Sequence, residues 1–325
     1  MASAPIATAT ELLARAHDGV LLYGLTPPRQ SSTREQADSI AAAALTRLES
    51  VHVDGLILYD VDAEADRTEA PRPFPFMPMM DPADFLDHHL AGWAGSVIVY
   101  RAVGKYGADQ LDQWLGEADQ GRVLTVLVGA ASRHQVVRTS LPEAYRRHAA
   151  LPRPPRMGGV VIAERHAEAG TEHLRMLRKQ EAGCEFFVSQ ICYDLNRTCN
   201  LLSDYAHNCR DQGLDPRPVV LTLAPCGSAK TLEFMTWLGI EVPRWLRAEI
   251  NRGARPPSSP RSPARPTSPS AATITQVTRH RPQQGRGHRA LTRRQGRPLG
   301  RRSRHPPARG DLQQLRFHRR EAGPP

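Results

Sequence analysis

A regular alternation of strand-like and helix-like segments along residues 20–250 most constrains the fold. Short apolar runs are followed by segments whose apolar residues recur at helical spacing. Strands that alternate with helices form a parallel sheet, because each helix carries the chain back to the start of the next strand. The seven predicted strands span residues 20–25, 55–59, 96–101, 123–128, 159–163, 185–190 and 219–224. The helical patterns span residues 33–48, 110–118, 171–182, 195–211 and 229–238, and a proline-broken loop at 70–93 ends in a further helix.

This pattern predicts an α/β fold, a (β/α)8 TIM barrel whose eighth strand is missing or replaced. A closed barrel of this kind needs eight strands. The eighth should lie just beyond residue 250, where the alternation stops. We therefore predict a barrel domain at residues 1–250 and a tail at residues 251–325.

The predicted tail differs from the barrel domain in charge and composition. It holds 18 Arg and no Lys, and its net charge of +16 leaves residues 1–250 with −6 of the formal total of +10. Its prolines and its lack of apolar spacing predict disorder, because too little apolar surface can be buried to offset the conformational entropy. Three interpretations of the tail stay open: it is natural disorder without a function, out-of-frame sequence from a GC-rich gene, or a basic arm that binds nucleic acid. Nucleic acid is the least favoured partner, since Phe317 is the tail's one aromatic residue.

Several classes of protein are excluded by what the sequence lacks. No apolar run approaches the roughly 20 residues that span a bilayer, and residues 1–9 have no secretory signal pattern. No Gly-x-Gly-x-x-Gly follows the first predicted strand, and "CGSAKT" lacks the glycine spacing of a phosphate loop. The five cysteines form no Cys-x-x-Cys pair, so neither a metal site nor a disulfide framework is expected. We expect a cytoplasmic protein with reduced thiols, no membrane partner and no metal.

Three segments resemble the methylenetetrahydrofolate reductase family. "YGLTPPRQ" (residues 23–30) ends the first predicted strand with a double proline and Arg29. "VVIAERHAEAGTEHLRMLRKQEAGCEFFVSQICYD" (160–194) is similar to the family's fifth strand, the helix after it and the sixth strand. "PVVLTLAPCGSAKTLEFMTWLGIEVPRW" (218–245) resembles the seventh strand and the segment after it.

The resemblance implies an oxidoreductase of one-carbon metabolism and methionine biosynthesis. It would reduce 5,10-methylenetetrahydrofolate to 5-methyltetrahydrofolate with NADH or NADPH, and FAD is the family's hydride relay. Gln190 and Asp194 would bind the folate, since an amide offers both a donor and an acceptor to the edge of the pterin ring. The residues that would contact the cofactor are Arg29, Gly129, His166, Ala169 and Lys179.

The chain departs from the family on three predicted strands. Gly24 stands where the family has a proton-donating Glu. Val128 and Ala130 replace the Arg and Asp of an Arg-Gly-Asp after the fourth strand, and Ile162 replaces a Tyr on the fifth. These changes predict that FAD binds weakly or not at all, so that hydride passes directly from the nicotinamide to the folate.

A replacement acid is needed to open the folate ring, and Glu164 and Asp60, both at predicted strand ends, are the candidates. Two other classes of function stay open. The chain could be a catalytically inactive barrel that acts as a folate-binding or regulatory protein. It could also be a nucleic-acid-binding protein that acts through its Arg-rich tail. Folate-dependent oxidation of NADH distinguishes the enzyme from both.

Overall fold

The computed structural model describes residues 6–63, 70–130, 136–253 and 273–278. Seven parallel strands follow one another in chain order around a ring, and helices lie between them in sequence. The predicted TIM-barrel-like α/β fold is thus confirmed, and each of the seven predicted strands is present. Their bounds are β1 Leu21–Leu25, β2 Gly55–Leu58, β3 Ser96–Ala102, β4 Val123–Val128, β5 Arg156–Val161, β6 Phe186–Ile191 and β7 Val219–Leu223.

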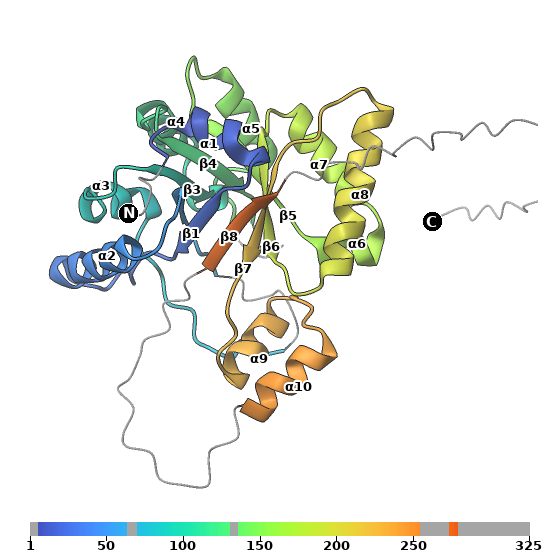
Figure 1. Cartoon of the computed structure of the whole chain (residues 1–325). Helices are drawn as coiled ribbons and strands as arrows, with labels where there is room; N and C mark the ends of the chain where they lie inside the picture. The colour runs from blue at the N-terminus through green and yellow to red at the C-terminus, as the bar shows by residue number, and fades with distance from the viewer. Residues whose placement is uncertain (1–5, 64–69, 131–135, 254–272, 279–325) are drawn as a thin grey trace, which may run out of the picture. The chain divides into compact units, whose positions relative to one another are not determined.

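An eighth strand, β8 (Thr273–Thr278), lies between β7 and β1 and closes the ring (Figure 1). It runs antiparallel to both neighbours, and its backbone pairs residue by residue with β1 and with β7. The prediction that the whole tail lies outside the barrel is therefore wrong for these six residues. Their sequence, TITQVT, has five β-branched residues, which favour extended backbone. The prediction missed this local signal because it rested on the average composition of the tail.

Strand β8 belongs to the same compact unit as the other strands, and the domain boundary predicted after residue 250 stays a prediction. The rest of the predicted tail, residues 254–272 and 279–325, lies outside the described residues, so its predicted disorder stays a prediction.

The helices begin and end close to the predicted positions, and those expected at 33–48, 110–118, 171–182, 195–211 and 229–238 are confirmed as α2, α4, α7, α8 and α9. The helix predicted at the end of the proline-broken loop is α3. The helices α1, α5, α6 and α10 were not predicted. For α1 and α6, six or seven residues are too few for a 3.6-residue period to stand out. The bounds are α1 Ala9–Ala14, α2 Arg34–Glu49, α3 Pro82–His89, α4 Ala108–Glu117, α5 Leu141–Ala150, α6 Ala163–Ala169, α7 Glu172–Glu181, α8 Leu195–Asp211, α9 Ala229–Trp237 and α10 Arg244–Gly253, with short 3-10 helices at Arg15–His17 and Val103–Lys105.

The inside of the barrel is filled by apolar side chains. Phe186 is 1% exposed and packs with inward residues of the neighbouring strands. A Cβ at Gly158 would lie only 2.5 Å from the Phe186 ring, so the missing side chain makes room for that ring. Leu12 and Ala16, at the N-terminal side of β1, pack against the same cluster. The N-terminal end of the barrel is therefore filled, and ligands must be sought at the other end.

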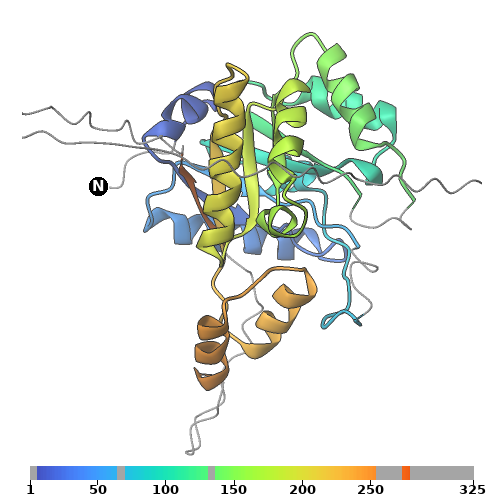
Figure 2. The ribbon, with the colours of Figure 1, turned by 90° about the vertical axis from the view of Figure 1, so that its right-hand side faces the viewer.

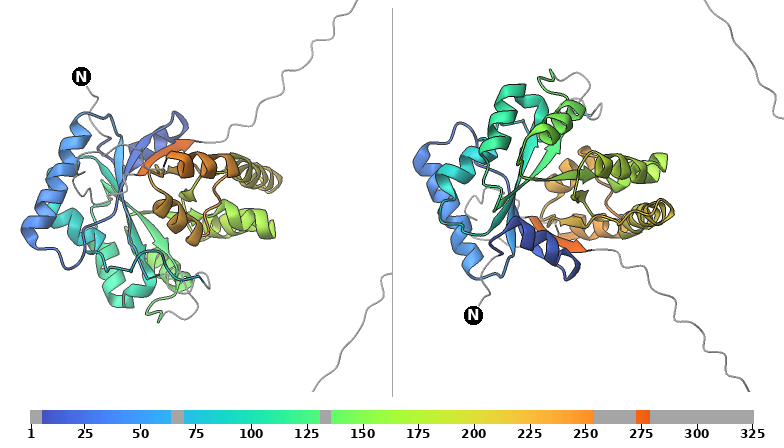
Figure 3. Two further views of the ribbon diagram at one scale, coloured as in Figure 1. Left: turned by 90° about the horizontal axis from the view of Figure 1, so that it is seen from below. Right: turned by 90° about the horizontal axis from the view of Figure 1, so that it is seen from above.

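The helices around the barrel form separate groups. Helix α2 and the α6–α8 group lie on opposite sides of the strands (Figure 3). Helices α9 and α10 do not cover the barrel wall; they stand together at one end of it (Figure 2). They share a small apolar cluster around Ala224, Met235 and Ile240, at the chain exit from β7. This helix pair therefore borders the C-terminal end of the barrel. Within the described residues, no helix combines the length and apolar character needed to cross a membrane.

Candidate functional site

The carboxyl ends of the parallel strands meet at one end of the barrel, where this fold places its chemistry. Tyr59 follows β2 and Tyr100 lies on β3, and both pack with the apolar cluster inside the barrel. Their rings meet edge to face, with centroids 5.0 Å apart and an interplanar angle of 61°. Tyr100 is buried, whereas Tyr59 is partly exposed and its ring can support a flat ligand ring. The sequence analysis missed both, although a Tyr at the carboxyl end of each of two successive apolar runs was a usable signal.

Gln190 lies on β6 near its carboxyl end. Phe186 and Val188 belong to the cluster inside the barrel, and strand alternation puts Gln190 on the same face. The pairing of β6 with β7 shifts register between Val188 and Ile191, an irregularity that often occurs next to binding sites. The Gln190 side chain is half-buried, and its Oε1 accepts a hydrogen bond from the Ile191 N–H at 3.2 Å. Its amide NH2 has no bonded partner among the described residues and is available to a ligand.

Glu164 lies in the first turn of α6, directly after β5. Its Oε1 accepts a hydrogen bond from the Glu241 N–H at 3.3 Å, which joins α6 to the connection between α9 and α10. Burial raises the pKa of the Glu164 carboxyl, and this exceeds the opposing effects of backbone N–H groups and of Arg197. A carboxyl with a raised pKa at a strand end can hold a proton and deliver it to a ligand.

Asp194 has a structural role in the described residues. It is the N-cap of α8, and its side chain accepts from the N–H groups of Asn196 and Arg197 at 3.0 and 3.2 Å. Its other oxygen is 3.2 Å from the Arg197 Nε. Helix capping explains these contacts, and the predicted contact with folate stays a prediction.

Asp60 follows β2, and its side chain is 1% exposed. Its carboxylate accepts hydrogen bonds from the Ala102 N–H at 2.7 Å, the Tyr106 hydroxyl at 2.7 Å and the Lys105 Nζ at 2.5 Å. A carboxylate that accepts from three groups, one of them a cation, is poorly suited to donate a proton. Of the two acids predicted from the sequence, Glu164 is therefore better placed than Asp60 to hold a proton. The three groups that contact Asp60 lie more than 40 positions after it in the sequence.

Two of the predicted cofactor residues lie at the carboxyl ends of strands. Arg29 is exposed in the loop after β1, and its backbone forms an isolated antiparallel bridge with Met79. Gly129 follows β4, is half-buried and lies against the side chain of Leu141. The positions Gly24, on β1, and Val128, which ends β4, carry no charged group at this end of the barrel.

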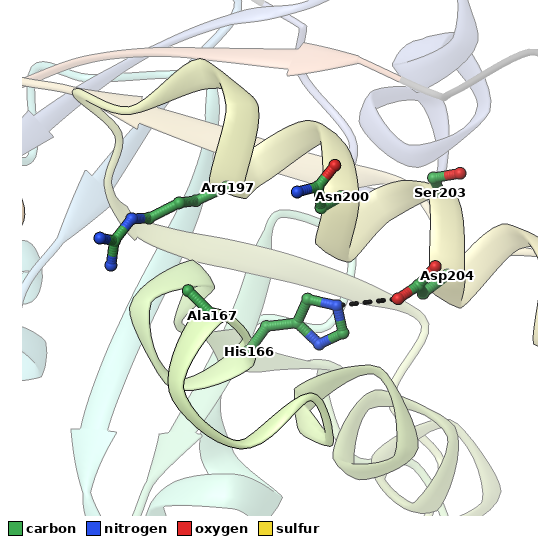
Figure 4. A pocket seen from close by; sticks show the side chains of 6 residues that line it. All are labelled: His166, Ala167, Arg197, Asn200, Ser203 and Asp204. Atoms are coloured by element: carbon green, nitrogen blue, oxygen red, sulfur yellow. Dashed lines mark hydrogen bonds and ion pairs between the residues drawn. The ribbon is translucent and has the colours of Figure 1, made fainter.

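The other three predicted cofactor residues lie on α6 and α7, outside the strands. The Lys179 Nζ donates a hydrogen bond to the carbonyl of Val160, and burial lowers the pKa of its ammonium group. Ala169 is exposed at the last position of α6. His166 is 7% exposed, and its Nε2 lies 3.0 Å from the Asp204 Oδ2 on α8 (Figure 4). Their roles in cofactor binding stay predictions.

Comparison with known proteins gives a relative among solved structures. No protein-family model and no curated protein matches the chain. Among solved structures, the chain is similar to an uncharacterized protein from Clostridium thermocellum that binds two copies of 5-methyl-5,6,7,8-tetrahydrofolic acid. The two chains are 33% identical, with a TM-score of 0.65, and the match covers 75% of this chain and 79% of that chain.

Proposed function

The chain belongs to the same family as the Clostridium thermocellum protein, and on this basis we propose that it binds a reduced folate at the carboxyl ends of its barrel strands. The observation that carries the proposal is Gln190, a half-buried amide on the inward face of β6 next to a break in the strand ladder.

The chemistry of a pterin fits this end of the barrel. A pterin ring has two flat faces and an edge on which hydrogen-bond donors and acceptors alternate. The Gln190 amide can pair with that edge, because an amide carries a donor and an acceptor side by side. The half-buried Tyr59 ring, which packs against the buried Tyr100 ring, offers an aromatic surface for a ring face.

Replacing Gln190 with Leu is expected to weaken the binding of 5-methyltetrahydrofolate by about 5- to 150-fold. Leu leaves polar groups of the ring edge unpaired in a partly dry site, which costs roughly 1–3 kcal/mol. Titration calorimetry of the purified chain measures the affinity. Gln212→Leu, at an exposed position just after α8, is the matched control and should bind as the wild type does. Normal folate binding by Gln190→Leu would exclude this amide as the contact, and loss of its folded structure would show a structural role instead.

We further propose that the chain reduces 5,10-methylenetetrahydrofolate with NADH or NADPH. An acid protonates the departing folate nitrogen, the five-membered ring opens to an iminium ion, and hydride from the nicotinamide adds to the exocyclic carbon. The product is 5-methyltetrahydrofolate. Glu164 supports this proposal, because its raised pKa suits the first step. A binding protein without catalysis is the second candidate, favoured by Gly24 and by the occupied carboxylate of Asp60. NADH oxidation that requires methylenetetrahydrofolate separates the two.

The residues present do not fit FAD, so no step is assigned to it. Val128 is apolar, Lys179 donates to a backbone carbonyl, and Ala169 is exposed on a helix outside the strands. The purified chain is therefore expected to be colourless, and added FAD should leave the rate of NADH oxidation unchanged. Visible absorbance measures bound flavin. A yellow preparation with one FAD per chain would contradict the expectation and would restore a flavin relay.

A further inference from the structure

Three helices outside the barrel place two histidines and an aspartate together. They are His166 on α6, His173 on α7 and Asp204 on α8, and one ligand atom of each lies within 4.8 Å of the others. The two imidazole rings meet edge to face with centroids 5.2 Å apart. The His166 Nε2 is 3.0 Å from the Asp204 Oδ2 (Figure 4).

These separations suit a small ion with nitrogen and oxygen ligands. Zinc binds imidazole nitrogen and carboxylate oxygen at about 2.0–2.2 Å in a tetrahedron, which sets two ligand atoms roughly 3.3 Å apart. The pair formed by His166 and Asp204 is already near this spacing. The His173 ring is half-buried, so a rotation of its side chain can bring its ligand atom closer.

Buried nitrogens in this cluster lack partners. The Nδ1 atoms of His166 and His173 are buried and have no hydrogen bond within the part of the chain that the structure describes. His166 is 7% exposed, so bulk water does not supply a hydrogen bond to its Nδ1. Buried polar atoms are nearly always paired in proteins, and an orphan needs an explanation. The orphan Nδ1 of His173 can coordinate a metal ion, whereas His166 would coordinate through the Nε2 that faces Asp204 and would keep its Nδ1 unpaired.

The cluster opens on one side to a pocket of about 320 Å³ between α6 and α8. His166 and Asp204 line it, together with Arg197, Asn200 and Ser203, which project from α8 in Figure 4. Two of the three proposed ligands thus border open space, while His173 is not among the lining residues, and the space leaves room on the ion for water or another ligand. The Arg197 guanidinium is paired with Asp194 at 3.2 Å, so part of its charge is already balanced.

We propose that His166, His173 and Asp204 bind one divalent transition-metal ion of the zinc class. Two imidazoles and one carboxylate select such an ion over magnesium or calcium, which prefer ligands that are all oxygen. The ion would join α6, α7 and α8 at one point on the outside of the barrel. This site stands apart from the residues assigned to folate, and it does not depend on the proposed function. No short sequence motif marks it, because its ligands come from three helices.

Zinc titration of the full chain, stripped with a chelator, tests the proposal. We expect one zinc ion per chain by elemental analysis after dialysis, and a rise in melting temperature on adding zinc. His173→Gln and Asp204→Asn change side chains that are not fully buried, so both variants should fold. Each should lower zinc affinity by roughly 100-fold or more, since loss of a group that only orients a ligand already costs 10- to 100-fold.

His207→Gln is the matched control, because His207 is an exposed histidine on α8 that is not part of the cluster. It should keep the stoichiometry and the thermal shift of the wild type. Absence of stoichiometric zinc in the wild type would overturn the proposal, and so would equal zinc affinity in the wild type and both ligand variants.

Discussion

A chain that ends at Ser270 is expected to be less stable than one that ends at Pro282 by about 4.5 kcal/mol. The shorter chain lacks β8, whose backbone pairs with four residues of β1 and five of β7. Nine lost pairings at roughly 0.5 kcal/mol each give this estimate, because water replaces part of every lost hydrogen bond. The loss is a large share of the 5–15 kcal/mol that stabilises an ordinary domain. Urea unfolding followed by circular dichroism measures the difference.

The chain that ends at Pro282 is the control, since it lacks residues 283–325 but keeps β8. It should unfold like the full chain. Without β8, β1 and β7 also become exposed edges that can pair with other molecules, so the shorter chain should form aggregates on size-exclusion chromatography. Equal stability of the two truncated chains would mean that β8 contributes nothing to the barrel in solution.

Glu164→Gln is expected to lower kcat for methylenetetrahydrofolate reduction by about 10²- to 10⁴-fold, the usual contribution of a positioned acid. Affinity for 5-methyltetrahydrofolate should hardly change, because Gln keeps the shape of the side chain and can still accept from the Glu241 N–H. Steady-state oxidation of NADH and calorimetry give the two values. Glu168→Gln, an exposed change on the same helix, is the matched control and should leave both unaltered.

The pH profile tests the same role independently. Burial raises the pKa of Glu164, and the carboxyl can donate a proton only while it is protonated. The wild-type rate should therefore be highest below that pKa and fall as the pH rises through it. The Glu164→Gln variant should lose this descending limb. A normal rate for Glu164→Gln, or an unchanged pH profile, would rule out Glu164 as the acid.

The architecture was predictable because most of the seven strands are apolar in their own sequence and are separated by segments with helical spacing. The start of β5 was placed three residues late, since Arg156 and the Gly158–Gly159 pair dilute its apolar pattern. Pairing with the neighbouring strand β4 sets the start of β5, because Leu124 pairs with Arg156 and Val126 with Gly158. Strand β8 shows the opposite error, because its own six residues favour a strand while the surrounding composition argues against one.

The candidate site was less predictable because its contacts join distant parts of the chain. Asp60 looked like a free carboxylate at a strand end, and only the fold brings Lys105 and Tyr106 to it. His166 was assigned to a cofactor from its local motif, whereas in the structure its Nε2 faces Asp204, 38 positions away. The position of Gln190 near the carboxyl end of β6 followed from the sequence, because it needed only the bounds of one strand.

The antiparallel closure by β8 also affects the order in which the molecule folds. Strands β1 to β7 each pair with a strand that is near in sequence, but β8 joins Leu22 to Thr275, roughly 250 residues apart. Contacts of such long range form late, because the entropy of closing the loop must be lost before they contribute. The junction of β7, β8 and β1 is thus the last part of the barrel to form and the first to open in local fluctuations. Backbone amides of β1 and β7 that face β8 should exchange their hydrogens faster than those between β3 and β4.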